Sequence, residues 1–167
     1  PSQRGACARA AKAKGYKEEF LLSTGLCYKR DNGQLQDRFF GRVIFPVHTL
    51  SGKVVAFGGR VLDAATKGVI VKYQNSPASA IYSKKKELYG LFLAKQAIVK
   101  HDLCFLVEGY TDVISMHQMG VENVVSSSGT ALTTEQIRMI HRFTENITVL
   151  YYGDAVVINA SERGIDM

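Results

Sequence analysis

The sequence predicts an α/β protein, with an α+β amino-terminal part followed by a mainly parallel sheet flanked by helices. Three observations support this prediction. After residue 100, apolar runs of strand length alternate with helix-favouring segments, which is typical of a parallel sheet. Two of these runs, 103–107 and 147–151, are followed closely by the carboxylates Glu108 and Asp154. Before residue 100, the chain is rich in β-favouring stretches and in basic residues.

Two short helices are expected at the amino-terminal end. Residues 6–14 are rich in Ala and Lys, which favour helix, and Gly15 follows them. Residues 17–23 form a second helix-favouring stretch that Gly25 closes. Both helices are predicted to be peripheral.

Strand structure is expected from residue 42 onward. The stretches 42–47 and 53–62 are separated by a turn, as in a hairpin. Pro46 has no N–H to give to a ladder, so its strand is predicted to lie at an edge or to bulge. Residues 72–77 predict a loop, and a helix is expected over about 88–100.

The second half of the chain alternates strands and helices. Strands are predicted at 103–107, 121–125 and 147–152, and helices at about 111–119, 134–143 and 155–163. Right-handed crossovers would bring the carboxyl ends of the strands to one edge, where open parallel sheets bind ligands. Glu108, the segment 126–129 and Asp154 would converge there, and two such carboxylates could hold a divalent cation.

The composition fits an ordinary globular protein. The 167 residues are 46% hydrophobic and 22% charged, so disorder is not expected. The sequence has no apolar run of about eighteen residues and no signal-peptide pattern, so we expect a cytoplasmic protein without membrane contact. Three scattered cysteines favour free thiols over a disulfide framework or a structural zinc site.

Charge is divided unevenly along the chain. Residues 1–100 contain 18 Lys or Arg and 6 Asp or Glu, a net charge of +12, whereas residues 101–167 contain 3 and 9, a net charge of −6. A basic region attracts polyphosphate, and acidic residues at strand ends suit magnesium. The alternative is a solvated basic face without a ligand.

Several sequence blocks carry a family resemblance. Val107–Val113, Ser128–Thr133 and Gly153–Ala155 resemble the TOPRIM fold of DnaG-type bacterial primases. Upstream blocks resemble the basic amino-terminal subdomain of that family's RNA polymerase core: 37–39, 42–46, 52–60, 73–77 and 87–90. The resemblance implies a basic primase-core subdomain over 1–100 and a TOPRIM subdomain over 101–167 that is truncated at its carboxyl end.

This resemblance implies an enzyme that copies single-stranded DNA into short RNA primers. The 3′-hydroxyl of the primer attacks the α-phosphate of a ribonucleoside triphosphate, with Mg²⁺ or Mn²⁺ as cofactor and no zinc in this segment. The implied partners are the DNA template, the triphosphates and the RNA primer. The full-length protein would also bind the replicative helicase, and the segment is expected to be monomeric.

The resemblance also assigns acidic site residues. Glu108 matches a glutamate that ligates metal and could carry a proton, and Asp154 matches a metal-binding aspartate. Asp112 matches the second acid of the family. For Glu108 the alternative role is to cap the following helix, and for Asp112 it is to stabilise the start of that helix through its dipole.

Basic and aromatic residues upstream match template-binding and nucleotide-binding positions. Arg42, Arg60 and Lys72 would contact phosphates, and Tyr73 and Phe39 would stack on bases. The alternative for Phe39 is a place in the core. The basic run Lys84–Lys86 is a further candidate for contacts with phosphate, and its alternative role is a solvated turn.

The sequence departs from the family pattern near its end. Tyr152 stands where the family has the first aspartate of an Asp-Gly-Asp motif, Val157 replaces a glycine, and Asn159 replaces a basic residue. A phenol is a poor magnesium ligand beside a carboxylate. The second hypothesis is therefore a catalytically impaired TOPRIM-like module that binds single-stranded nucleic acid.

Overall fold

The computed structural model describes residues 3–61, 71–129 and 131–151. The chain divides into two compact units, one within Pro1–Pro46 and Val55–Tyr82, and the other within Val47–Val54 and Ser83–Met167. Each unit has a hydrophobic core of its own. None of the helices in the described part of the chain is long and apolar enough to cross a membrane.

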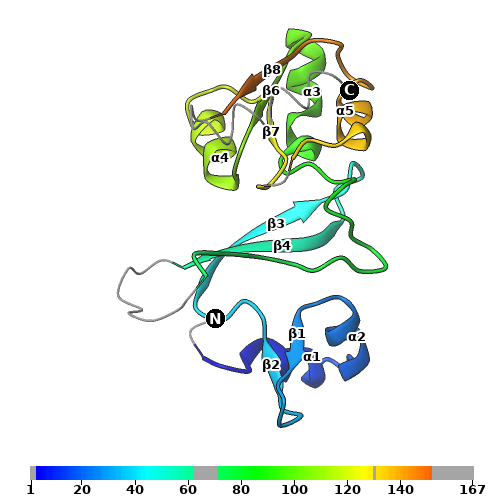
Figure 1. The fold of residues 1–167 in the computed structure, drawn as a ribbon, viewed down its shortest axis with the longest axis vertical. Coiled ribbons are helices and arrows are strands. Elements are labelled where there is room, and N and C mark those ends of the chain that lie inside the picture. Colours follow the sequence, from blue (N-terminus) through cyan, green and yellow to red (C-terminus); the bar gives the residue numbers. More distant parts are fainter. Residues whose placement is uncertain (1–2, 62–70, 130, 152–167) are drawn as a thin grey trace. The chain divides into compact units, whose positions relative to one another are not determined.

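The first unit begins with two helices and a small hairpin (Figure 1). Helices α1 (Ala6–Ala13) and α2 (Glu18–Ser23) lie where the sequence predicts them, and strands β1 (Cys27–Lys29) and β2 (Leu35–Asp37) pair antiparallel. The sequence analysis did not predict this hairpin, because three-residue strands are too short to show a clear alternation.

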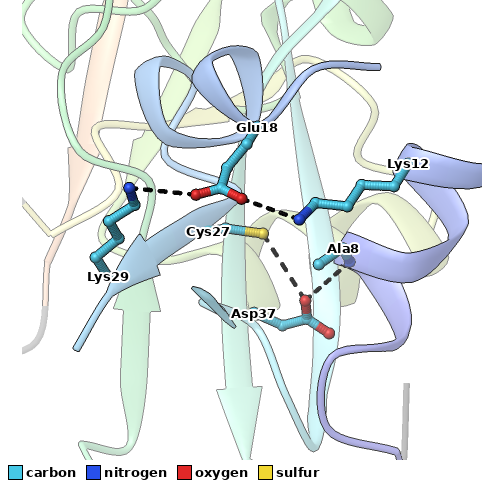
Figure 2. Close-up of polar contacts among 6 residues, drawn as sticks. All are labelled: Ala8, Lys12, Glu18, Cys27, Lys29 and Asp37. Carbon is cyan, nitrogen blue, oxygen red and sulfur yellow. Dashed lines mark hydrogen bonds and ion pairs between the residues drawn. The ribbon is translucent and has the colours of Figure 1, made fainter. Parts of the chain in front are cut away.

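Polar contacts join these elements around the buried residues Ala8, Leu21 and Cys27. In Figure 2 the carboxylate of Glu18 lies between two lysine ammonium groups. Its oxygens are 2.9 Å from Nζ of Lys12 in α1 and 3.3 Å from Nζ of Lys29 in β1. The three side chains are well exposed, so we expect these ion pairs to add little to stability.

A three-stranded sheet follows in the order β3-β4-β5. Strands β3 (Arg42–His48) and β4 (Val54–Val61) confirm the predicted hairpin, and β3 is an edge strand of this sheet, as Pro46 indicated. The prediction of a loop is wrong for β5 (Tyr73–Asn75), which pairs antiparallel with Gly58–Arg60. Its polar residues pair through the backbone and need no apolar alternation.

The second unit contains the predicted parallel sheet, which confirms the fold class. Strand β6 (Cys104–Val107) lies between β7 (Val124–Ser126) and β8 (Ile147–Leu150) in the described sheet, and both neighbours run parallel to it. Helices α3 (Leu91–His101), α4 (Tyr110–Gln118) and α5 (Thr134–Ile140) connect and flank these strands. The predicted helix at 155–163 lies outside the described residues.

Helices cover both faces of this parallel sheet (Figure 1). On one face, Leu91 and Ile98 of α3 and Ile140 of α5 pack against Leu106 and Val125. On the other face, Val113 of α4 packs with Val107 and Val124. Coverage on both sides explains why these strands are continuous apolar runs.

The tip of the β3–β4 hairpin packs on α3 within this second unit. The Phe92 ring stacks on His48, with centroids 5.8 Å apart, and Lys95 Nζ donates to the carbonyl of Leu50 at 3.2 Å. A Cβ atom at Gly52 would lie 2.7 Å from the Phe92 ring. The close approach therefore requires glycine at this position.

Candidate functional site

The carboxyl end of the parallel sheet brings three segments together. Val107, the last residue of β6, pairs with Ser126 in β7 and with Leu150 in β8. The residue that follows each strand therefore lies at the same edge, and these residues are Glu108, Ser127 and Tyr151. This is the edge at which the sequence predicts a ligand site.

Hydrogen bonds fix the main chain at Glu108. Ser126 Oγ donates to the Glu108 carbonyl at 2.8 Å, and the Gly129 N–H donates to the same carbonyl at 3.1 Å. The Ser128 N–H donates to Ser126 Oγ at 2.9 Å. Ser128 and Gly129 have φ angles of 60° and 75°, so the loop after β7 turns sharply around the end of β6. This geometry confirms the predicted approach of 126–129 to Glu108.

Tyr151 lies within electrostatic range of Glu108. Burial raises the pKa of the Tyr151 phenol, a hydrogen bond with the Ser127 side chain opposes this shift, and the Glu108 charge raises the pKa further. The phenol is therefore protonated at neutral pH. Sequence analysis placed Ser127 at this edge within the segment 126–129, but it did not identify Tyr151 or the pairing of the two side chains, because nothing in an apolar strand or a serine run indicates a pairing across the sheet.

Asp112 has a clear structural contact. Its Oδ2 accepts a hydrogen bond from the Gly109 N–H at 2.9 Å, where Gly109 is the N-cap of α4. The carboxylate therefore supports the start of the helix, as the alternative role proposed. The N-cap position itself is occupied by Gly109, the residue after Glu108.

The remaining predicted acidic residue, Asp154, lies outside the described residues, as do Tyr152, Val157 and Asn159. Among residues 3–61, 71–129 and 131–151, no group of three His, Cys, Asp or Glu side chains is arranged to hold a metal ion. Glu108 offers the hard oxygen ligand that magnesium prefers. Asp112 has one carboxylate oxygen engaged by Gly109.

In the first unit, Arg60 and Tyr73 form a pair on neighbouring strands. They are register partners in β4 and β5, and the Arg60 guanidinium carbon lies 5.2 Å from the centroid of the Tyr73 ring. Both residues were predicted to contact nucleic acid. Their pairing places a cation and an aromatic face side by side, a combination suited to phosphate and base.

Arg42 binds main-chain carbonyls of its own unit. Its guanidinium donates to Val71 at 2.8 Å, to Lys72 at 3.2 Å and to Gly59 at 3.4 Å. Burial lowers the pKa of Arg42. Arg42 therefore holds the start of β5 against β4, a role that the sequence analysis did not predict.

Phe39 belongs to the core, as the alternative proposed. Its side chain is buried, and its ring meets Phe57 edge to face with centroids 6.1 Å apart. A Cβ atom at Gly59 would lie 2.9 Å from the Phe39 ring. Lys72 directly precedes β5 and is exposed.

Comparisons with known proteins identify the class of this chain. A family model described as "DNA primase catalytic core, N-terminal domain" matches residues 1–95, and one described as "Toprim-like" matches residues 105–167. Together these matches define a Toprim-containing primase core. Because the first model covers more than half of the sequence, the chain belongs to the DnaG-type DNA primase family, which confirms the resemblance.

Individual relatives agree with this assignment. A DNA primase from Clostridium acetobutylicum is 45% identical over 157 residues, which are 93% of this chain and 25% of the relative. The RNA polymerase domain of Mycobacterium tuberculosis primase DnaG matches with a TM-score of 0.88 and 33% identity, over 100% of this chain and 56% of that chain. A DnaG primase catalytic domain bound to single-stranded DNA matches with a TM-score of 0.85 and 34% identity, over 99% and 50%.

The chain spans about a quarter of the length of the curated relatives that it matches. The family model for the amino-terminal domain ends at residue 95 and the Toprim-like model begins at residue 105. In the structure, helix α3 (Leu91–His101) belongs to the same compact unit as the parallel sheet.

Proposed function

We propose that this chain is part of a primase catalytic core that copies single-stranded DNA into short RNA primers. In this reaction the primer 3′-hydroxyl gives its proton to water, and its oxygen bonds to the α-phosphorus of a ribonucleoside triphosphate. The bond from that phosphorus to the bridging oxygen breaks, and pyrophosphate leaves. The observation that carries the proposal is Glu108 at the end of the central strand of a Toprim-like sheet, after a primase-type amino-terminal domain.

Toprim domains of primases depend on metal. Here Mg²⁺ or Mn²⁺ would be held through Glu108 and Asp154, and a bound cation would lower the pKa of the hydroxyl and neutralise charge on the leaving group. Ser126 and Gly129 donate hydrogen bonds to the Glu108 carbonyl. These bonds hold the main chain from which the Glu108 carboxylate extends. Asp112, one turn further along in α4, would act as the second acid.

The basic unit would bind the template and the triphosphate. Arg60 and Lys72 would contact phosphates, and Tyr73, with Arg60 over its ring, would stack on a base. Arg42 would act at the same surface, with its guanidinium also supporting β5. The relative bound to single-stranded DNA supports a DNA template as the partner.

The wider setting follows from the same family. We propose that the full gene product works in the cytoplasm and binds the replicative helicase, and that this segment by itself is a monomer. This segment would supply the basic and Toprim-like parts of its polymerase core.

A second candidate function rests on Tyr152. The phenol occupies the position of a metal-binding aspartate in the family pattern, which favours a Toprim-like module that binds single-stranded nucleic acid and has lost catalysis. This module would keep the basic unit and its affinity for phosphate.

Primer synthesis on a single-stranded oligonucleotide, with labelled ribonucleotides and Mg²⁺, separates the two candidates. The full gene product should make short RNA, and Glu108→Gln should reduce the yield at least tenfold, whereas the exposed Glu122→Gln control should not. Binding of the oligonucleotide without synthesis in the unaltered protein would favour the second candidate. If Glu108→Gln made as much RNA as the unaltered protein, Glu108 would have no role in the reaction.

A further inference from the structure

Two uncharged side chains flank Glu108 at the end of the parallel sheet. Ser127 follows β7 and Tyr151 follows β8, each one residue beyond the register pairs of Val107. Alternation along the strands puts these three residues on the face of Leu106, Val125 and Val149, the face covered by α3 and α5. Tyr151 packs against the core cluster of that face.

Ser127 and Tyr151 bond to each other across the central strand. Their side chains share a hydrogen bond, and Tyr151 also interacts electrostatically with Glu108. Neighbouring strands lie about 4.8 Å apart, so β7 and β8 are separated by the width of β6. A tyrosine side chain is long enough to span this distance, and Glu108 follows the strand that lies between β7 and β8.

We infer that Ser127 and Tyr151 are positioning residues for the Glu108 carboxylate. The inference rests on the proposed function of Glu108 as a metal ligand. The serine is 3% exposed, so its hydroxyl cannot exchange its partner for bulk water without opening the loop after β7. The pair therefore closes one side of the space available to Glu108 and limits the rotamers that its carboxylate can adopt.

The chain also fixes the backbone on both sides of this pair. The loop after β7 is held by the Ser126 hydroxyl at the Glu108 carbonyl and by the Ser128 N–H at Ser126. Tyr151 is anchored by the core that it packs against. Groups of this kind that orient a metal ligand typically change metal affinity by about tenfold or more when removed, which sets the expected size of the effect.

The test is Mn²⁺ binding to this chain, measured by electron paramagnetic resonance of the free ion. Tyr151→Phe and Ser127→Ala should each weaken binding about tenfold, and the double variant should be no weaker than either single variant, because each change already breaks the same bond. Ser127→Thr keeps a hydroxyl and should restore binding to within about threefold of the unaltered chain.

Tyr110→Phe is the matched control. Tyr110 is also buried, and its side chain bonds to Ser128 in the same loop, but it comes from helix α4. It should change Mn²⁺ affinity less than twofold. Urea unfolding of every variant checks that the affinities are compared between folded proteins.

The outcomes separate this inference from the proposed function. Glu108→Gln should abolish most Mn²⁺ binding, and if it does not, Glu108 is not a ligand and both proposals fail. If Glu108→Gln weakens binding while Tyr151→Phe and Ser127→Ala do not, the site stands and the positioning role is wrong. Equal losses in Tyr151→Phe and Tyr110→Phe would indicate general loosening and would also overturn the inference.

Discussion

The carboxylate of Asp37 lies at the amino-terminal end of helix α1, where its Oδ1 accepts a hydrogen bond from the Ala8 N–H at 3.0 Å (Figure 2). Its Oδ2 accepts from the Cys7 N–H at 2.9 Å. The N-cap residue of this helix is Gly5, which has no side chain to do this. A residue about thirty positions away therefore provides the cap, and the hairpin β1–β2 and helix α1 stabilise each other.

We expect Asp37→Ala to lower the free energy of unfolding by about 2–4 kcal/mol, because two helix N–H groups lose a charged acceptor in a buried place. Asp37→Asn keeps one acceptor oxygen and should cost less. Urea denaturation followed by circular dichroism measures both, with the exposed Asp31→Ala as the control. Equal stability of Asp37→Ala and the control would show that water replaces the carboxylate at no cost.

The sequence predicts the elements of the second unit well because each has a strong signal. Strand β6 is a four-residue apolar run, and Thr133 with Gln136 forms a capping box at the start of α5, with hydrogen bonds of 3.2 Å in both directions. Strand β7 begins at Val124 and not at residue 121, because periodicity does not show where a short strand starts to pair.

The site was predicted less completely than the fold. Glu108 stands out as a carboxylate after an apolar run, but the contacts of Ser127, Tyr151 and Arg42 join residues far apart in the chain. Asp37 also bonds over a separation of about thirty residues. Spacing along a sequence identifies local caps and strand ends, whereas such long-range partners follow only from packing.

The second prediction separates the two roles of Asp112. Asn at this position can still accept from the Gly109 N–H, so Asp112→Asn should keep the free energy of unfolding within about 0.5 kcal/mol of the unaltered protein. Asp112→Ala loses the contact and should cost about 1 kcal/mol. If the charge also serves the reaction, primer synthesis by the full gene product should fall at least tenfold in Asp112→Asn. Full activity in that variant would leave Asp112 a structural residue only.

The third prediction concerns the salt dependence of DNA binding. Arg60→Ala and Lys72→Ala should each weaken binding to a labelled single-stranded oligonucleotide and reduce the slope of log K against log salt by about 0.7, the effect of one phosphate contact. Fluorescence anisotropy at several salt concentrations measures the slope.

Two further variants serve as comparisons for this titration. The exposed Arg30→Ala should leave the slope unchanged, although it removes the same charge. Tyr73→Ala should weaken binding by about 1–3 kcal/mol through lost stacking while the slope stays nearly constant. Identical slopes for Arg60→Ala, Lys72→Ala and Arg30→Ala would mean that the β4–β5 surface does not contact phosphate.

The fourth prediction concerns alkaline pH. Burial raises the pKa of the Cys104 thiol from 9.0 to about 12, and this side chain is fully buried. Between pH 9 and about 12 the unfolded thiol has lost its proton while the folded thiol keeps it, so the unfolded state binds fewer protons. Well below pH 9 this thiol does not change the free energy of unfolding with pH. Above pH 9 the free energy of unfolding falls as the pH rises, by up to about 1.4 kcal/mol per pH unit.

Cys104→Ala provides the reference for this measurement, because it removes the thiol and leaves the other titrating groups in place. The difference in unfolding free energy between the unaltered chain and Cys104→Ala should be constant from pH 7 to 8.5. It should then shift against the unaltered chain by about 1 kcal/mol between pH 9 and 10. Urea denaturation with a reductant present measures it, and a difference that is constant up to pH 10 would contradict the raised pKa.

The last prediction concerns the tyrosine that stands at the aspartate position of the family motif. Magnesium and manganese favour carboxylate oxygens over a neutral phenol, so Tyr152→Asp should tighten Mn²⁺ binding by about tenfold, equal to about 1.4 kcal/mol. Calorimetry with Mn²⁺ measures the change, and Tyr152→Asn is the control that removes the ring without adding charge. In the full gene product, Tyr152→Asp should also raise primer synthesis if the remaining acidic ligands are present. Unchanged affinity in Tyr152→Asp would place the metal away from position 152, and tight binding of two ions by the unaltered chain would show that other residues bridge them.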